Sequence, residues 1–165
     1  MASATHVMDL TGTGYCASFN FRRTARAVTS LFDEALQASG IRSTQFTILV
    51  GIAKSQPAAI SAIAKVLVID RTTLTRSLRL LQKEGFLSIS ERSRMRQRFV
   101  LLTPKGEKAL ALALPLWRKI QSHFIDAIGS EYWLNLRHEL ERLSLVATSL
   151  EAGENPSETA SQSHP

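Results

Sequence analysis

The chain has 165 residues, 44% of them hydrophobic and only 7% aromatic, so it can form one ordinary core, and its composition favours packed helices over a sheet sandwich. No apolar run approaches the roughly 20 residues that cross a bilayer, and no secretory signal is present. The single cysteine, Cys16, excludes an intramolecular disulfide. We therefore expect a cytoplasmic protein. The net charge of +6 indicates an anionic partner.

The N-terminal part of the chain predicts a flexible arm and then a helix. Residues 1–15 are mostly small and polar, as in a loosely ordered segment. Apolar residues recur with helical period over residues 16–39, and Gly40 stands where a glycine commonly ends a helix. The apolar stripe consists of Ala17, Phe21, Ala25, Val28, Phe32, Ala35 and Leu36.

Three further helices are predicted between residues 41 and 85. The first covers residues 44–54, and Ser55-Gln56-Pro57 ends it. A short helix follows at residues 59–67, and Asp70 then opens a longer one to about Glu84, because its carboxylate can accept the free amide donors of a first turn. The inward-facing residues are predicted to be Phe46, Leu49, Val50 and Ala53 in the first helix and Leu74, Leu78 and Leu81 in the last.

After Gly85 the hydrophobic period changes from helical to twofold. Residues 86–89 and 99–102 read as two strands, and an arginine-rich segment lies between them. A helix-turn-helix followed by a basic hairpin is the plan of a winged helix. The predicted fold is therefore mainly α (α+β), with a winged helix-turn-helix DNA-binding domain at residues 41–103.

Two long helices are predicted after the hairpin. Thr103 is expected to cap the first, with Pro104 at its first position and a kink at Pro115. Gly129-Ser130 separates it from a helix at about 131–150, where Leu136, Leu140, Leu143 and Val146 are in line, and residues 151–165 read as a disordered tail. Because a small domain needs little more core, residues 16–40 and 104–150 are predicted to be dimerisation helices of a homodimer.

The positive charge is concentrated in the centre of the chain. Residues 65–108 hold eleven Lys and Arg against four Asp and Glu, a net +7 in a chain whose total is +6. We expect this segment to bind double-stranded DNA. The helix would contact base edges, and the hairpin would contact phosphates or the minor groove. In the hairpin, an extended chain would place the arginines on one face. The predicted DNA-binding residues are Arg71, Thr72, Thr73, Thr75, Arg76, Arg79, Arg92, Arg94, Arg96 and Arg98. A winged-helix module that binds nucleic acid or protein non-specifically is the alternative.

Several segments resemble the MarR family of transcriptional regulators across residues 16–150. The resemblance rests on Thr44-Gln45-Phe46, on residues 60–64, 70–76 and 80–87, and on Leu102-Thr103-Pro104-Lys105-Gly106 after the hairpin. It implies a homodimer that binds a pseudo-palindromic operator. We expect it to repress transcription, with DNA binding modulated by a small-molecule or redox signal. Two positions depart from the family. The main hairpin arginine is Arg96, and Arg94 stands at the preceding position that is usually acidic, so that either Glu91 substitutes for the acidic residue or the hairpin is looser. Ala59 replaces the Thr or Ser that commonly caps the helix.

Cys16 has two interpretations. Peroxide-sensing members of the family keep a reactive cysteine near the start of the first helix, so the resemblance makes Cys16 a candidate redox sensor; a helix N-terminus also favours the reactive thiolate. The alternative, which free cysteines more often follow, is that the thiol fills space in a core.

Other chemistry is less well supported. The resemblance suggests a pocket for a small aromatic effector, lined by aromatic residues that could equally be part of the core. These residues are Phe19, Phe21, Phe46, Trp117 and Trp133. The four histidines are widely spaced and predict no metal site, and no cofactor-binding motif is present. Because no nucleophile elbow or phosphate-binding glycine loop occurs either, the chain is not expected to be an enzyme.

Overall fold

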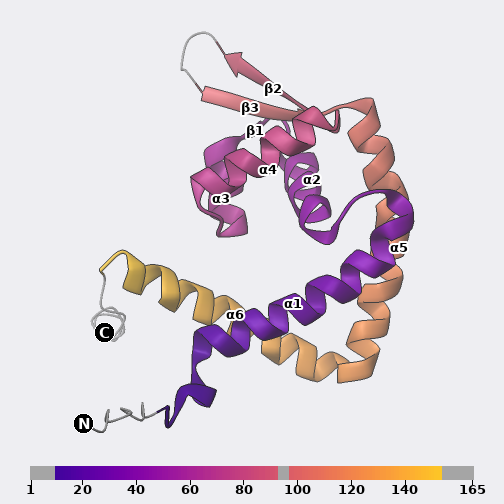
Figure 1. Ribbon diagram of the computed structural model, residues 1–165. Helices are drawn as coiled ribbons and strands as arrows, with labels where there is room; N and C mark the ends of the chain where they lie inside the picture. Colours follow the sequence, from indigo (N-terminus) through magenta and orange to yellow (C-terminus); the bar gives the residue numbers. More distant parts are fainter. Residues whose placement is uncertain (1–9, 93–96, 154–165) are drawn as a thin grey trace, which may run out of the picture. The chain divides into compact units, whose positions relative to one another are not determined.

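The computed structural model describes residues 10–92 and 97–153. The chain divides into two compact units, residues 1–118 and residues 119–165, and each is described here by itself (Figure 1). Among the described residues, no helix is both long and apolar enough to cross a membrane.

The first unit begins with a short 3-10 turn and a long helix. The turn η1 (Thr13–Tyr15) precedes α1 (Ala17–Leu36), and the 3-10 turn η2 (Gln37–Ser39) ends at Gly40, which has φ 75° as expected of a terminating glycine. The predicted single helix over residues 16–39 is thus divided in two. Of the predicted flexible arm, residues 1–9 lie outside the described residues, whereas the end of the arm is held to α1 by hydrogen bonds from Asn20 Nδ2 to the carbonyl oxygens of Gly14 (3.1 Å) and Cys16 (3.0 Å).

The three predicted central helices are confirmed as α2 (Ser43–Ser55), α3 (Ile60–Leu67) and α4 (Arg71–Lys83). The inward face predicted for α2 is partly wrong. Phe46 and Leu49 are buried, but the other buried positions are Ile48 and Ile52, while Val50 and Ala53 are only partly covered. α2 packs against α1, α3 and β3, so more than one of its faces is covered.

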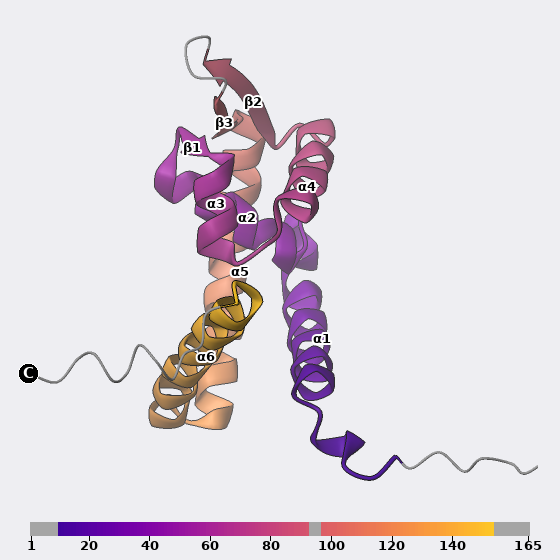
Figure 2. The same cartoon turned by 90° about the vertical axis from the view of Figure 1, so that its left-hand side faces the viewer.

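A three-stranded antiparallel sheet completes the winged helix. Its strands β1 (Ala58–Ala59), β2 (Leu87–Arg92) and β3 (Gln97–Leu102) lie in the order β1-β3-β2. The two predicted strands are present, although Phe86 precedes β2 and both strands extend further toward the hairpin tip than expected. β1 was not predicted. Figures 1 and 2 show the β2–β3 hairpin extending beyond α3 and α4.

The start of α5 (Pro104–Ile128) is hydrogen-bonded to the residues that end α4. As predicted, Thr103 caps this helix: its Oγ1 accepts from the Gly106 amide at 3.1 Å and donates to the Gly85 carbonyl at 2.6 Å. Gly106 lies so close to the chain before β2 that an added Cβ would stand 1.9 Å from the Phe86 carbonyl oxygen. α5 runs through Pro115 as one helix.

One core of buried side chains joins the helices and the sheet of the first unit. It includes Leu36 of α1, Leu49 and Ile52 of α2, the three buried leucines of α4 (Leu74, Leu78 and Leu81), and Val100 of β3. The aromatic ring of Phe46 stacks on Trp117 of α5 with 5.7 Å between centroids. α4 therefore rests on a packed platform, and its opposite face is left to solvent.

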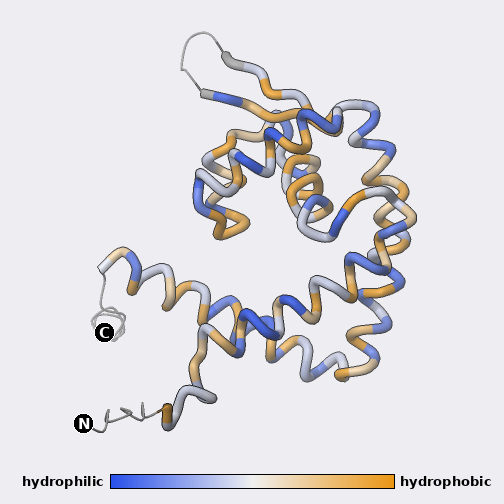
Figure 3. Tube along the Cα trace, in the orientation of Figure 1, coloured by the Kyte–Doolittle hydropathy of each residue, from blue (hydrophilic) through white to orange (hydrophobic). Residues whose placement is uncertain are grey.

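The second unit contains the end of α5 and α6 (Ser130–Glu151), with Gly129 between them at φ 90°. Phe124 and Trp133 pack edge to face across this turn at 6.2 Å. α6, which the structure describes completely, has no buried residue, and Figure 3 shows apolar positions recurring along it. Residues 154–165 of the predicted tail lie outside the described residues.

Candidate nucleic-acid interface

Helix α4 presents a fixed polar surface because its other side is anchored in the core. Leu74 and Leu78 have no exposed surface, and Leu81 is 1% exposed. The predicted cap is confirmed, since Asp70 Oδ1 accepts from the amides of Thr72 (2.9 Å) and Thr73 (2.8 Å). The side-chain hydrogen bond from Thr73 contributes most to holding the pKa of Asp70 below its ordinary value of 3.8, and the two amide bonds and the charge of Arg76 add to the effect.

The side chains predicted to read DNA lie on the solvent side of α4. Arg71, Thr72, Thr73, Arg76 and Arg79 are exposed, and Thr75 is half-buried. Two helical hydroxyl groups donate back to the backbone: Thr75 Oγ1 to the Arg71 carbonyl at 2.6 Å, and Ser77 Oγ to the Thr73 carbonyl at 3.1 Å. Their oxygens keep acceptor capacity toward a ligand.

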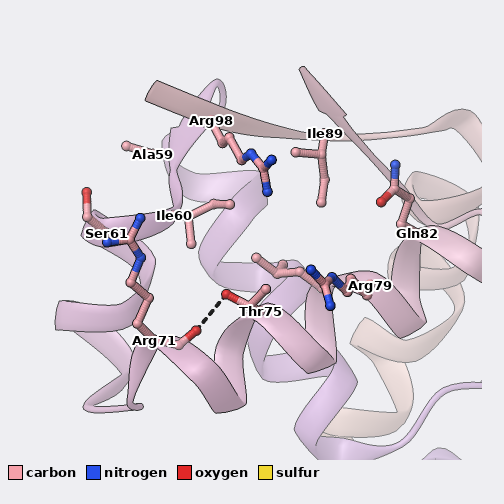
Figure 4. Close-up of a pocket in the computed structure, with 10 residues that line it drawn as sticks. Ala59, Ile60, Ser61, Arg71, Thr75, Arg79, Gln82, Ile89 and Arg98 are labelled. Atoms are coloured by element: carbon pink, nitrogen blue, oxygen red, sulfur yellow. Dashed lines mark hydrogen bonds between the residues drawn. The ribbon is translucent and has the colours of Figure 1, made fainter. Parts of the chain in front are cut away.

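A groove lies between α4 and the sheet, with a volume of about 550 Å³. Arg71, Thr75 and Arg79 face it because they are spaced by four residues and share one side of the helix. Arg98 reaches it from β3, so that guanidinium groups of two separate elements point toward one space (Figure 4). The full lining is Ala59, Ile60, Ser61, Arg71, Thr75, Leu78, Arg79, Gln82, Ile89 and Arg98, and none of these residues is acidic.

Six residues that line this groove were not among the predicted site residues: Ala59, Ile60, Ser61, Leu78, Gln82 and Ile89. Gln82 follows Arg71, Thr75 and Arg79 on the same side of α4, so helical spacing alone could have identified it. Ser61 and Ile89 come from α3 and β2, and only the packing of those elements brings them to the groove.

Of the four hairpin arginines that were predicted to share one extended face, the structure places Arg92 and Arg98 only. β2 ends at Arg92 and β3 begins at Gln97, and the chain reverses between them, with Glu91 opposite Arg98 and Arg92 opposite Gln97 in the ladder. Arg92 and Arg98 therefore stand on different strands. Arg94 and Arg96 lie outside the described residues.

The remaining candidates are spread over the molecule. Cys16 is exposed and immediately precedes α1, so within one chain it fills no core. Of the aromatic residues considered for an effector pocket, Phe46 and Trp117 pair with each other in the first unit, Trp133 pairs with Phe124 in the second, and Phe19 and Phe21 are exposed. No cluster of three metal-ligating side chains occurs in the described part of the chain.

The missing cap of α3 is also visible in the structure. Ala59 occupies the N-cap position with φ −69° and ψ 133°, and no side chain accepts a hydrogen bond from the first turn. The amides at this end of α3 thus adjoin the arginine-lined groove, because Ala59, Ile60 and Ser61 are part of its lining.

Comparison with known proteins identifies relatives that share both sequence and fold. Residues 41–94 match the sequence profile of the MarR family. A Bacillus cereus protein described as an uncharacterized HTH-type transcriptional regulator is 30% identical over 110 residues, which cover 67% of this chain and 74% of the relative.

Two solved structures extend the likeness to nearly the whole of each relative. The M. tuberculosis transcriptional regulator MosR, in complex with DNA, is 33% identical with a TM-score of 0.76, and the match covers 82% of this chain and 98% of MosR. The S. aureus MepR–DNA complex, at 17% identity, has a TM-score of 0.66 over 83% of this chain and 98% of MepR. The second likeness supports the fold alone, and the predicted winged helix-turn-helix fold is confirmed.

Proposed function

Because this chain belongs to the MarR family of transcriptional regulators, we propose that it regulates transcription by binding a pseudo-palindromic duplex DNA site as a homodimer. Repression is the proposed direction of control. The support from relatives is that MosR, 33% identical to this chain, was solved in complex with DNA.

The observation that carries this proposal is the groove lined by Arg71, Arg79 and Arg98 beside the solvent face of α4. Guanidinium groups bind phosphate oxygens and base edges with two parallel hydrogen bonds, and an exposed helix of this length fits a major groove. The leucines on the opposite side of α4 are fully buried, so the helix cannot turn away from this orientation without opening the core.

The residues have different proposed roles. Arg71, Thr72, Thr73, Thr75, Arg76 and Arg79 on α4 contact base edges and adjacent phosphates, while Arg92, Arg94, Arg96 and Arg98 of the hairpin contact phosphates or the minor groove. Residues 41–103 form the DNA-binding domain, and residues 16–40 and 104–150 form the dimerisation helices.

A salt series tests DNA binding directly. The affinity of the purified protein for a labelled duplex from the region upstream of its own coding sequence should fall steeply with ionic strength, because each neutralised phosphate releases counterions. With about six phosphate contacts, affinity should drop on the order of 10³-fold between about 50 mM and about 200 mM salt. An affinity that stays flat over this range would refute the proposal.

A non-specific winged-helix module would pass the salt test, so a second experiment is needed. Selection of bound duplexes from a randomised pool should yield a consensus with two-fold symmetry and half-sites one helical turn or a multiple apart. A pool that remains random after several rounds would favour the non-specific alternative.

For the signal that modulates binding, we propose either oxidation of Cys16 or a small aromatic effector. The exposure of Cys16 beside the first turn of α1 makes it accessible to an oxidant. Peroxide should release DNA from the natural protein and leave a Cys16→Ser variant bound. Release of both proteins, or of neither, would exclude the cysteine, and titration with aromatic acids would then test the effector.

A further inference from the structure

The first turn of α2 is hydrogen-bonded to α1 on one side. Asp33 of α1 is half-buried, and its Oδ1 accepts from the Ser43 amide at 2.7 Å and from Ser43 Oγ at 2.6 Å. Ser43 is the first residue of α2, so its amide is one of the donors that a helix leaves free at its N-terminus. Asp33 supplies from a different helix the carboxylate that a local cap would otherwise provide, and it does so with two charge-assisted bonds.

The same turn of α2 is hydrogen-bonded to the end of α4 on its other side. Gln45 Oε1 accepts from the Arg42 amide at 2.8 Å, which fixes the orientation of the side-chain amide. Gln45 Nε2 then donates to Glu84 Oε2 at 2.9 Å, a bond between residues 39 positions apart. Glu84 is the C-terminal cap residue of α4, and its own carbonyl accepts from Lys105 Nζ at 2.6 Å.

These bonds cross a region that side chains do not fill. A hollow of about 460 Å³ between the start of α2 and the second half of α4 is lined by Arg42, Thr44, Gln45, Ile48, Ser77, Leu80 and Glu84, among others. Leu80, on this flank of α4, is 50% exposed. Two other residues of the lining, Ile48 and Leu81, are buried in the core, so apolar packing holds α4 against α2 on that side. The Gln45–Glu84 bond adds a directional contact at the C-terminal end of α4.

We propose that Asp33 and Gln45 are positioning residues that hold α4 in register with α1 through the first turn of α2. A displacement of α1 is passed through Asp33 and Ser43 to residues 42–45, and from Gln45 to Glu84 at the end of α4. The expected effect on DNA binding rests on the proposed function. The expected effect on the position of α4 rests only on the four hydrogen bonds made by Asp33 and Gln45.

A reversal of the Gln45–Glu84 bond gives a sharp test. Gln45→Glu keeps the acceptor for the Arg42 amide but sets two carboxylates against each other. Glu84→Gln keeps a partner for Gln45, and the double variant Gln45→Glu/Glu84→Gln restores the bond with its polarity reversed. At a temperature where circular dichroism shows every variant folded, Gln45→Glu should bind the operator duplex about fivefold or more weakly, and the double variant should recover most of this loss.

A distance measurement separates positioning from simple stabilisation and does not need DNA. In a Cys16→Ser background, spin labels at Thr24→Cys on α1 and Lys83→Cys on α4 would be placed on exposed sites, with labelled chains diluted in unlabelled protein. The distance distribution should broaden or shift by about 1–2 Å in Gln45→Glu and return in the double variant. An unchanged distribution in folded Gln45→Glu would overturn the proposal, whether or not the protein binds DNA.

The α1 side has its own pair of variants, useful if Gln45→Glu does not fold. Asp33→Asn keeps an oxygen acceptor for Ser43, whereas Asp33→Ala removes it. The label distance should change in Asp33→Ala and change less in Asp33→Asn, and operator affinity should follow the same order. Equal distances in the two variants and the parent protein would contradict the role of Asp33. A normal distance response without DNA binding by any protein would refute the proposed function and leave the positioning role intact.

Discussion

Asp70 is an acidic residue at the start of a basic surface, and its place there is explained by the backbone. Its carboxylate accepts hydrogen bonds from the Thr73 side chain and from the amides of Thr73 and Thr72 at the positive end of α4, and these bonds favour the charged form and lower its pKa. In the unfolded chain the pKa returns to its ordinary value of 3.8. The carboxylate therefore adds stability above that pH, and the contribution disappears as the pH falls through the lower pKa of the folded state.

Asp70→Asn tests this pH dependence, because asparagine keeps an oxygen acceptor but does not titrate. The melting temperature of the natural protein should exceed that of the variant at about pH 6 and lose this advantage toward about pH 2. Thermal unfolding followed by circular dichroism across the range measures the difference. A difference that is constant with pH would show that the charge of Asp70 contributes nothing.

Arg76 and Arg98 should differ in how their loss affects DNA binding. Arg76 lies on the outward face of α4, and if it contacts a base, Arg76→Ala should cost about 1–3 kcal/mol at the preferred site and relax the preference at one position of each half-site. Arg98→Ala on β3 should weaken all sequences alike. Competition binding with single-base operator variants distinguishes the two patterns. Arg118→Ala, which removes an exposed arginine from α5, is the control for lost charge.

At the scale of elements, the helices could be predicted because their apolar residues follow the helical period and their ends carry strong signals, such as Asp70, Gly85 and Thr103. β1 could not, since the pair Ala58-Ala59 has no pattern of its own and becomes a strand only by pairing with Phe99 and Val100. The site divides in the same way. The spacing of Arg71, Thr75 and Arg79 was sufficient to place them on one side of α4, whereas the approach of Arg98 and Ser61 depends on tertiary packing.

Gly106 shows a constraint that helix propensity alone would misjudge. Alanine is ordinarily about 1 kcal/mol better than glycine inside a helix. Here the added Cβ would meet the Phe86 carbonyl oxygen at 1.9 Å, and both atoms belong to backbone segments fixed by the Thr103 bonds. Gly106→Ala should therefore lower the free energy of unfolding by about 3 kcal/mol or more.

Gly51 offers a matched control in the same molecule. It lies inside α2, and an added Cβ would meet no atom within 4 Å. Gly51→Ala should leave stability unchanged or raise it by up to about 1 kcal/mol. Urea unfolding of both variants measures the two free energies. If Gly106→Ala proves as stable as Gly51→Ala, the close approach of α5 to Phe86 is not as tight as described.

At the scale of the whole molecule, the two terminal helices carry apolar side chains that one chain leaves in water. On α1, Phe19 and Phe21 are 53% and 47% exposed, and on α6 Leu140, Leu143 and Leu145 are 37%, 40% and 66% exposed. Scattered apolar residues are normal on a protein surface, but rows of them along two helices indicate a covered face. Positive charge and exposed apolar surface are thus concentrated in different parts of the chain, which is consistent with the proposed homodimer.

Leu140→Glu tests whether α6 is such a face. Burial of a glutamate against an apolar partner is unfavourable, so the variant should shift from dimer to monomer in sedimentation equilibrium. Its melting temperature should fall and should depend less on protein concentration, because unfolding of a monomer involves no dissociation. Operator affinity should fall with it, because two recognition helices bind two half-sites only when their chains are joined. Val66→Glu adds the same charge at a 75% exposed position of α3 and should leave the dimer intact. If both variants sediment as the natural protein does, Leu140 lies outside the dimer contact. If the natural protein is itself monomeric, the two-fold geometry that the proposed operator requires is absent.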